Sequence, residues 1–133
     1  MSSRIATIED YAWVNKVAKE VSYIIGGNIF FILKGLLAGE VKNQNLLVYP
    51  ELGFIHYKKY AKFSKVIDFG VSKEARRSGV GKALWQAVPK PIFVETDDGA
   101  AESNGFYLKN GCKLYGQRLS RKGKLINIYL CAQ

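Results

Sequence analysis

The stretch Val66–Leu84, VIDFGVSKEARRSGVGKAL, decides the fold of this 133-residue chain. It begins with a β-branched and aromatic run that ends at Val71, which is typical of a strand. A basic, glycine-spaced turn follows at Arg76–Gly81, and then an apolar helix-like segment that runs to about Val88. Glycines let a ligand approach the backbone, and the first N–H groups of a helix have no partners within it. The order of strand, basic turn and helix therefore predicts a site for phosphate groups.

Three known phosphate-loop patterns compete for this turn. A Walker A loop is excluded, because Ala83 follows the Gly-Lys pair and Arg76 occupies the position of the first glycine. A dinucleotide fingerprint is excluded because the third glycine, three residues after Gly81, is replaced by Leu84. The third pattern, Arg-x-x-Gly-x-Gly between a strand and a helix, is matched by Arg76, Gly79 and Gly81. It resembles the pyrophosphate loop of the GNAT superfamily of acyl-CoA-dependent N-acyltransferases.

A second segment carries the same resemblance. Residues 100–112, AAESNGFYLKNGC, are similar to the GNAT signature of an Ala/Asn-rich helix that carries Phe-Tyr and is followed by a glycine and an aromatic residue. Asn104, Phe106, Tyr107 and Gly111 match that signature, and a cysteine replaces the final aromatic residue. The two motifs together cover about residues 66–112, with a predicted strand between them.

The rest of the chain predicts further helices and strands. Helical spacing of apolar residues runs from Thr7, a predicted N-cap, to Ile25. The segment Asn28–Ala38 is compatible with a helix or a strand, and Arg4–Ala6 offers only a short first strand. Strands are predicted at Leu46–Tyr49, Gly53–Tyr60, Lys65–Val71 and Pro91–Thr96, a helix at Ala100–Asn110, and a hairpin at Lys113–Leu119 and Leu125–Leu130. By resemblance, residues 1–133 form one α/β (α+β) domain of the GNAT fold, a mixed, mostly antiparallel sheet with helices on both faces.

The resemblance implies acetyl-CoA as acyl donor and assigns residues to it. The backbone of Phe69 and Val71 would contact the pantetheine arm, and Asn104 resembles a family asparagine that also contacts it. Tyr107 matches a tyrosine that protonates the leaving thiolate. The pyrophosphate cradle would consist of Arg77, Ser78, Gly79, Val80, Gly81 and Lys82, and the guanidinium of Arg76, which begins the motif, would either order the loop or contact a phosphate.

The general base that accepts a proton from the amine is left open. Many family members carry a glutamate on the strand before the phosphate loop, and no such residue shares the strand face of Val71 here. The candidates are Asp68, His56, Glu51 and Glu95, of which His56 is the only histidine in the chain and has a suitable intrinsic pKa.

The expected function is acetyl-CoA-dependent N-acetylation of a primary amine. A small amine, a protein amine, an aminoacyl-tRNA and a nucleobase are all acceptors served by this fold, and the sequence does not choose among them. The alternative is a non-catalytic module on the same fold that binds acyl-CoA or nucleic acid, and the absence of an obvious base motivates it.

The net charge of +9 is unevenly spread along the chain. Residues 41–90 carry ten basic and three acidic side chains, and residues 106–133 carry six basic and none acidic. An anionic cofactor accounts for part of this charge, and the excess favours an anionic acceptor or a nucleic-acid partner, although a solvated basic surface explains it equally well. One basic and aromatic stretch resembles a nucleic-acid surface, but an ordinary surface strand with its loop is the preferred interpretation: Tyr57, Lys58, Lys59, Tyr60, Lys62, Phe63 and Lys65.

Location, metals and oligomeric state follow from simpler signals. No segment has the length and apolarity of a membrane span or a signal-peptide core, so a cytoplasmic protein without membrane contact is expected. No Cys/His cluster has zinc spacing, so no metal is expected. Cys112 and Cys131 would lie opposite each other in the hairpin, and we expect them to stay reduced, as cytosolic thiols do. The resemblance adds a homodimer as an expectation, without a legible interface.

Overall fold

The computed structural model of the protein describes residues 3–20 and 43–132, and every structural statement below concerns these residues. The helix or strand predicted at 28–38 and the end of the helix predicted from Thr7 lie outside them. No helix in the described ranges is long and apolar enough to cross a membrane.

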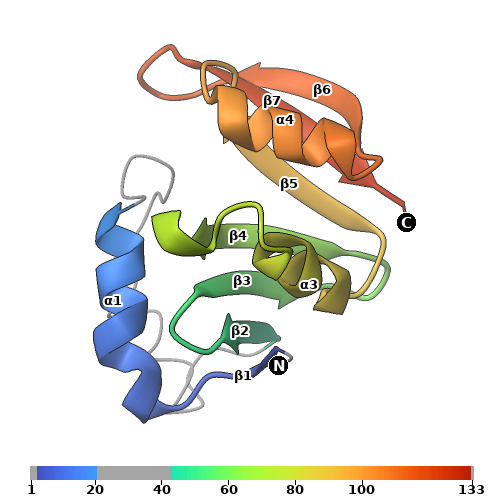
Figure 1. Cartoon of the computed structure of the whole chain (residues 1–133). Coiled ribbons are helices and arrows are strands. Elements are labelled where there is room, and N and C mark those ends of the chain that lie inside the picture. The colour runs from blue at the N-terminus through green and yellow to red at the C-terminus, as the bar shows by residue number, and fades with distance from the viewer. Residues whose placement is uncertain (1–2, 21–42, 133) are drawn as a thin grey trace.

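A central sheet organises the described residues (Figure 1). Its seven strands lie in the order β1-β2-β3-β4-β5-β7-β6. All neighbouring strands are antiparallel except β4 and β5, which are parallel, so the prediction of a mixed, mostly antiparallel sheet is confirmed. The strands are β1 (Arg4–Ile5), β2 (Gln44–Tyr49), β3 (Gly53–Lys59), β4 (Ser64–Val71), β5 (Ile92–Asp97), β6 (Lys113–Leu119) and β7 (Leu125–Cys131).

Helices cover both faces of this sheet, as predicted. On one face, α1 (Tyr11–Glu20) buries Val14 and Val17 against β2 and β3. On the other face, α3 (Val80–Ala87) and α4 (Ala101–Lys109) close a larger core around Trp85. Short 3-10 turns precede α1 at Ile8–Asp10 and follow β4 at Lys73–Ala75.

Asp10 joins β1 to the start of α1. Its buried carboxylate accepts hydrogen bonds from the backbone N–H of Thr7 at 2.8 Å and from the indole N–H of Trp13 at 2.9 Å. It also accepts two bonds from the Arg4 guanidinium, at 2.8 and 2.9 Å. The bonds from Arg4 hold the pKa of Asp10 well below its usual range, despite burial. Thr7 occupies the N-cap position at this helix start, as predicted.

The two parallel strands separate soon after they meet. Only Ser64–Val66 of β4 pairs with Ile92–Val94 of β5. Beyond this point β4 continues to Val71 and β5 to Asp97 without pairing to each other, so their facing backbone groups are left unpaired.

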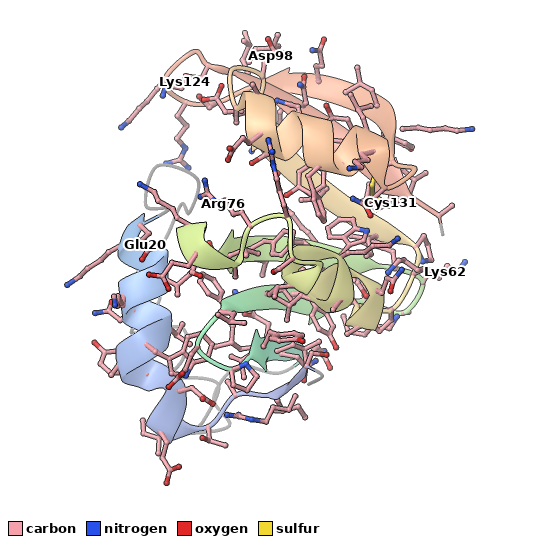
Figure 2. The ribbon with its side chains drawn as sticks, in the orientation of Figure 1. Glu20, Lys62, Arg76, Asp98, Lys124 and Cys131 are labelled. Atoms are coloured by element: carbon pink, nitrogen blue, oxygen red, sulfur yellow. A yellow bond between two sulfur atoms is a disulfide. The ribbon has the colours of Figure 1, made fainter. Side chains whose placement is uncertain are left out.

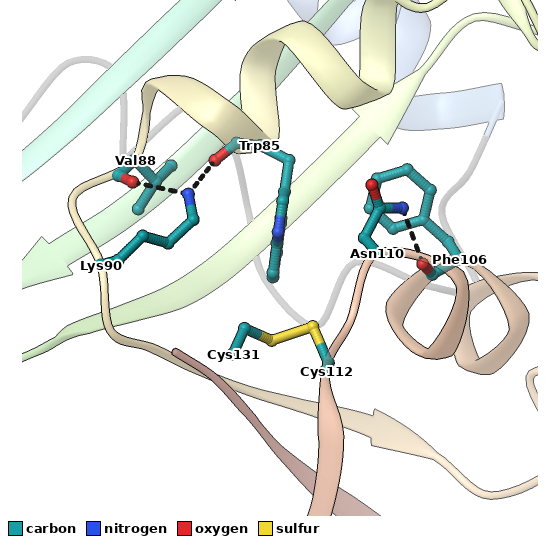
Figure 3. The surroundings of a disulfide bond; sticks show 7 residues. All are labelled: Trp85, Val88, Lys90, Phe106, Asn110, Cys112 and Cys131. Carbon is teal, nitrogen blue, oxygen red and sulfur yellow. Dashed lines mark hydrogen bonds between the residues drawn. A yellow bond between two sulfur atoms is a disulfide. The ribbon is translucent and has the colours of Figure 1, made fainter. Parts of the chain in front are cut away.

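The two cysteines form a disulfide, which corrects the expectation of free thiols. Lys113 of β6 lies opposite Leu130 of β7, so the next pair outward, Cys112 and Cys131, face each other with their Cα atoms 4.2 Å apart. Both are buried, and the indole of Trp85 points toward the bond (Figure 3). The predicted hairpin placed the thiols correctly, and this close approach outweighs the general tendency from which reduced thiols were expected.

Candidate active site

A cleft of about 580 Å³ lies where β4 and β5 diverge. The end of β4, the loop that leads into α3, and α4 form its walls. Seven of the predicted cofactor-binding residues line it: Phe69, Val71, Arg76, Arg77, Gly79, Gly81 and Lys82. The sequence motif and the cleft therefore coincide.

The loop at the mouth of the cleft has a left-handed backbone at two positions. Arg77 has φ 67° and Gly79 has φ 88°, and the helical residue Val80 follows directly. A left-handed residue next to a right-handed one directs successive N–H groups to the same side, an arrangement that binds anions. Ser78 and Val80 do not line the cleft: the Ser78 hydroxyl donates a hydrogen bond to the carbonyl of Ala75, and the Val80 side chain is buried in the core.

Positive charge dominates the lining of the cleft. Among the described residues that line it, Arg76, Arg77, Lys82 and Lys109 contribute four cationic side chains and Glu102 the one carboxylate. Arg76 reaches from the loop to α4, where its Nη1 lies 3.2 Å from the Glu102 carboxylate. The cleft therefore attracts an anionic ligand.

The inner part of the cleft is apolar, and a glycine keeps it open. The rings of Phe69 and Phe106 meet edge to face with centroids 5.4 Å apart. A Cβ at Gly81 would lie 3.5 Å from side-chain atoms of Phe106 and Val71 and 3.6 Å from Phe69, and would occupy space between them. The cleft therefore fits a ligand with an anionic end and a long arm that carries amide groups. The basic loop can bind the anionic end, and the unpaired backbone of β4 can bind the amide groups.

Tyr107 lines the cleft from α4 and is almost completely buried. Its ring packs against Trp85 at 5.3 Å and Tyr129 at 5.5 Å. Burial, and secondarily the neighbouring Tyr129, raises the pKa of the Tyr107 phenol well above its usual value. The phenol is therefore protonated at neutral pH and can donate a proton.

Asn104 lies outside the lining of the cleft. Its amide nitrogen donates to the carbonyls of Asp97 at 3.0 Å and Ala100 at 2.8 Å, and its amide oxygen accepts from the Tyr129 hydroxyl at 2.6 Å and Asn127 at 3.0 Å. These bonds fix the loop between β5 and α4 and tie it to β7. A direct contact of Asn104 with a cofactor stays a prediction.

His56 and Asp68 form a buried pair on the other face of the sheet. They lie opposite each other on β3 and β4, with His56 Nδ1 3.3 Å from Asp68 Oδ2 and His56 Nε2 2.7 Å from Gln44 Oε1. Asp68 alternates with Phe69, which lines the cleft, so the pair faces the side covered by α1. The sequence suggested each residue separately and did not indicate that they touch.

The other two base candidates lie elsewhere. Glu51 is exposed in the turn between β2 and β3. Glu95 on β5 accepts a 2.6 Å hydrogen bond from Arg118 and lies 3.6 Å from Lys65. The bond from Arg118 lowers the pKa of Glu95. No group of three His, Cys, Asp or Glu side chains in the described ranges is placed to hold a metal ion.

Further residues on and directly after α4 line the cleft, and of these the sequence motif had included Phe106 but not Ser103 or Asn110. Ser103, Phe106 and Asn110 lie four residues before, one before and three after Tyr107, and all line the cleft. Helical spacing from Tyr107 was the signal that could have found Ser103 and Asn110.

Comparison with known proteins identifies the fold. The structure is similar to Ard1 from Thermoplasma volcanium, with a TM-score of 0.75 and 19% sequence identity over 99% of this chain and 98% of that chain. A GNAT-family acetyltransferase from Bacillus cereus ATCC 10987 gives a TM-score of 0.74 at 17% identity, over 99% and 96% of the chains. A Bacillus anthracis protein in complex with acetyl coenzyme A gives 0.58 at 23% identity, over 70% and 64%. No family model and no curated protein matches the sequence.

Three observations indicate the same fold: the seven-stranded mixed sheet, the helices on both of its faces and these structural similarities. The chain has the fold of the GNAT acetyltransferases over nearly its whole length, as the two sequence motifs predicted.

Proposed function

We propose that the protein is an acetyl-CoA-dependent N-acetyltransferase that transfers an acetyl group to a primary amine by direct attack on the thioester. The observation that carries this proposal is the coincidence of the predicted pyrophosphate loop with the mouth of the cleft between β4 and β5. The GNAT fold and the complex of a structural neighbour with acetyl coenzyme A support it. Fold alone does not determine activity, so the residues of the site carry the argument.

In this proposal, different residues of the cleft bind different parts of the cofactor. Arg77, Lys82 and the N–H groups around Gly79 hold the pyrophosphate at the start of α3. The backbone of Phe69 and Val71, which β5 leaves unpaired, holds the amide-containing arm. Acetyl-CoA supplies an acetyl group activated as a thioester when it is bound.

Tyr107 acts as the general acid in this proposal. Its hydroxyl is kept protonated by burial, so Oη can donate its proton to the departing thiolate. The high pKa of the phenol excludes it as the base that activates the amine.

The acceptor amine approaches from the face of the sheet that carries His56 and Asp68 in this proposal. Asp68 or His56 accepts the proton that the attacking amine loses, through water because both side chains are buried. The net charge of +9 favours an anionic acceptor or one linked to nucleic acid, such as an aminoacyl-tRNA or a base.

The second candidate is a non-catalytic module that binds acyl-CoA without turnover. One observation favours it: among the described residues that line the cleft, the one carboxylate, Glu102, is already paired with Arg76. Turnover separates the two candidates, because both predict cofactor binding.

The test is calorimetric titration of the protein with acetyl-CoA and with free coenzyme A, followed by assays of thiol release with amines, peptides and aminoacyl-tRNA. Gly79→Asp should abolish binding of both cofactors, because it places a carboxylate beside the phosphates and strains a left-handed position. Gly123→Asp is the matched control, since Gly123 also has a left-handed backbone (φ 78°) but lies in the distant β6–β7 turn. Retained binding in Gly79→Asp would refute the loop assignment, and binding without turnover on any amine would favour the second candidate.

A further inference from the structure

Four aromatic rings form a continuous row across the sheet, and we call Tyr60, Phe63, Phe93 and Tyr115 the aromatic row. Tyr60 stacks on Phe63 with centroids 4.7 Å apart. Phe63 meets Phe93 edge to face at 5.2 Å, and Phe93 meets Tyr115 edge to face at 5.2 Å. The rings come from the β3–β4 loop, β5 and β6, so the fold gathers residues that are far apart in sequence.

The aromatic row lies on the face of the sheet opposite the cleft. Ile92 and Val94 point into the core beneath α3 and α4, so Phe93 between them points to the other face. On that face, the apolar cluster beneath α1 takes in β2 and β3 and, among the described residues, no residue of β5, β6 or β7. Tyr115 is 66% exposed and Tyr60 is 38% exposed. In the described part of the chain, these rings therefore offer accessible apolar surface.

Basic side chains border the aromatic row. The ammonium of Lys58 lies 5.1 Å from the centroid of the Tyr60 ring. Lys62 is exposed in the β3–β4 loop, at the edge of the molecule opposite Glu20 (Figure 2). The nearby carboxylate of Glu95 is paired with both Lys65 and Arg118, so it does not offset the remaining positive charge.

We infer that the aromatic row and its lysines bind a single-stranded nucleic acid, with bases stacked on the rings and phosphates on the lysines. Exposed rings bordered by cations on an open sheet face are the elements that bind single strands, because unpaired bases present their faces for stacking. A duplex keeps its base faces covered. A second copy of the chain would bring two basic borders together in a protein of net charge +9, which disfavours self-association through this face.

The test is fluorescence anisotropy of the full chain with labelled U12 and dT12, and with a 12-base-pair DNA duplex, in the absence of coenzyme A. We expect tighter binding of the single strands than of the duplex. If about three phosphates are contacted, the slope of log K against log salt for single strands is about −2. Titration of the same samples with acetyl-CoA separates a failure of this inference from a failure of the proposed acetyltransferase.

Tyr115 provides the sharpest variants, because it is exposed on an edge strand and contributes little to the core. Tyr115→Leu keeps an apolar side chain but removes the aromatic face, and should weaken single-strand binding about fivefold or more. Tyr115→Phe keeps the ring and should bind like the parent. Lys62→Gln should weaken binding and reduce the salt slope by about 0.7, whereas Lys19→Gln, on the distant exposed surface of α1, should change neither.

Three results would overturn the inference. The first is equal affinity for single strands and duplex, which assigns the binding to general charge. The second is unchanged affinity in a folded Tyr115→Leu variant. The third is a dimer in sedimentation that Tyr115→Asp dissociates, together with no oligonucleotide binding by the parent, which assigns the aromatic row to a second copy of the chain.

Discussion

The half of the sheet formed by β1–β4 and the half formed by β5–β7 are stabilised by different kinds of interaction. In the first half, the Asp10 carboxylate ties β1 to α1 through hydrogen bonds with Arg4, Thr7 and Trp13. In the second half, the disulfide between Cys112 and Cys131 closes the hairpin of β6 and β7. Low pH should therefore destabilise the first half, and a reductant should destabilise the second half. Three paired residues on each of β4 and β5 join the halves, and the cleft lies directly beyond that junction.

The largest expected effect comes from removing the side chain that packs at the junction. Trp85 is 2% exposed and contacts Phe69, Phe106 and Tyr107. Trp85→Ala should lower the free energy of unfolding by about 3–5 kcal/mol, because it leaves a large cavity between the halves. Chemical denaturation measures this change.

The control at the same position is Trp85→Phe. The indole N–H has no hydrogen-bond partner in the described structure, so its loss leaves no group unpaired. Phe should retain most of the stability, and an equal loss in both variants would show that cavity formation is not the cause.

Breaking the disulfide is the second largest change and is confined to the β5–β7 half. The bridge closes a loop with a sequence separation of 19, so its removal should lower the free energy of unfolding by about 3 kcal/mol. The double variant Cys112→Ser with Cys131→Ser, compared with the parent with and without reductant, measures it. Reductant should destabilise the parent and leave the variant unchanged; a parent that is insensitive to reductant while fully reduced by thiol titration would contradict this prediction.

Asp10 gives a smaller change in the β1–β4 half. Asp10→Ala should lower the free energy of unfolding by about 2 kcal/mol, because the N–H groups of Thr7 and Trp13 lose their acceptor. The pKa of Asp10 is lowered in the folded state, so this contribution is complete above its ordinary value of 3.8 and is lost as the pH falls further.

The pH dependence distinguishes charge from hydrogen bonding at Asp10. Asp10→Asn keeps an acceptor oxygen but has no carboxylate to protonate, so its stability should fall less steeply than that of the parent between pH 4 and lower values. Parallel pH profiles of the parent and Asp10→Asn would show that another group causes the acid sensitivity.

Tyr107→Phe has the smallest expected effect. It changes turnover in the cleft rather than the stability of either half of the sheet. Turnover should fall at least about tenfold, equivalent to about 1.4 kcal/mol, because the proton donor is lost. Affinity for acetyl-CoA should stay nearly constant, since the ring is retained. Steady-state kinetics with calorimetry measure both, and equal turnover in the variant would remove Tyr107 from the acid role.

Most of the fold was predictable because its signals are local. The segment Val66–Leu84 combined a strand, a glycine turn and a helix start, each with its own residue types, and the structure places all three as predicted. The prediction that both cysteines stay reduced was wrong, because disulfide formation depends on how closely the ends of the two strands approach in the folded chain. The aromatic row was only partly visible in the sequence: Tyr60 and Phe63 stood out, but Phe93 and Tyr115 join them only through the sheet.

The site was predictable where it is built from one continuous segment. Gly79 and Gly81 were found because a phosphate loop needs glycines at fixed spacing, and both line the cleft. The contact of His56 with Asp68 depends on the register of β3 against β4, which a single sequence does not specify. Asn104 matched a motif, but its hydrogen bonds to β7 depend on partners more than twenty residues away.

The disulfide also makes the hairpin a closed covalent ring. The turn between β6 and β7 exposes three residues after which trypsin cleaves, Arg121, Lys122 and Lys124. All three lie inside the loop that Cys112 and Cys131 close. A cut in this turn would therefore leave two fragments that migrate as one molecule until a reductant separates them. The bridge would hold β7, which carries Cys131 and pairs with β5, on the domain even after its peptide connection to β6 is lost.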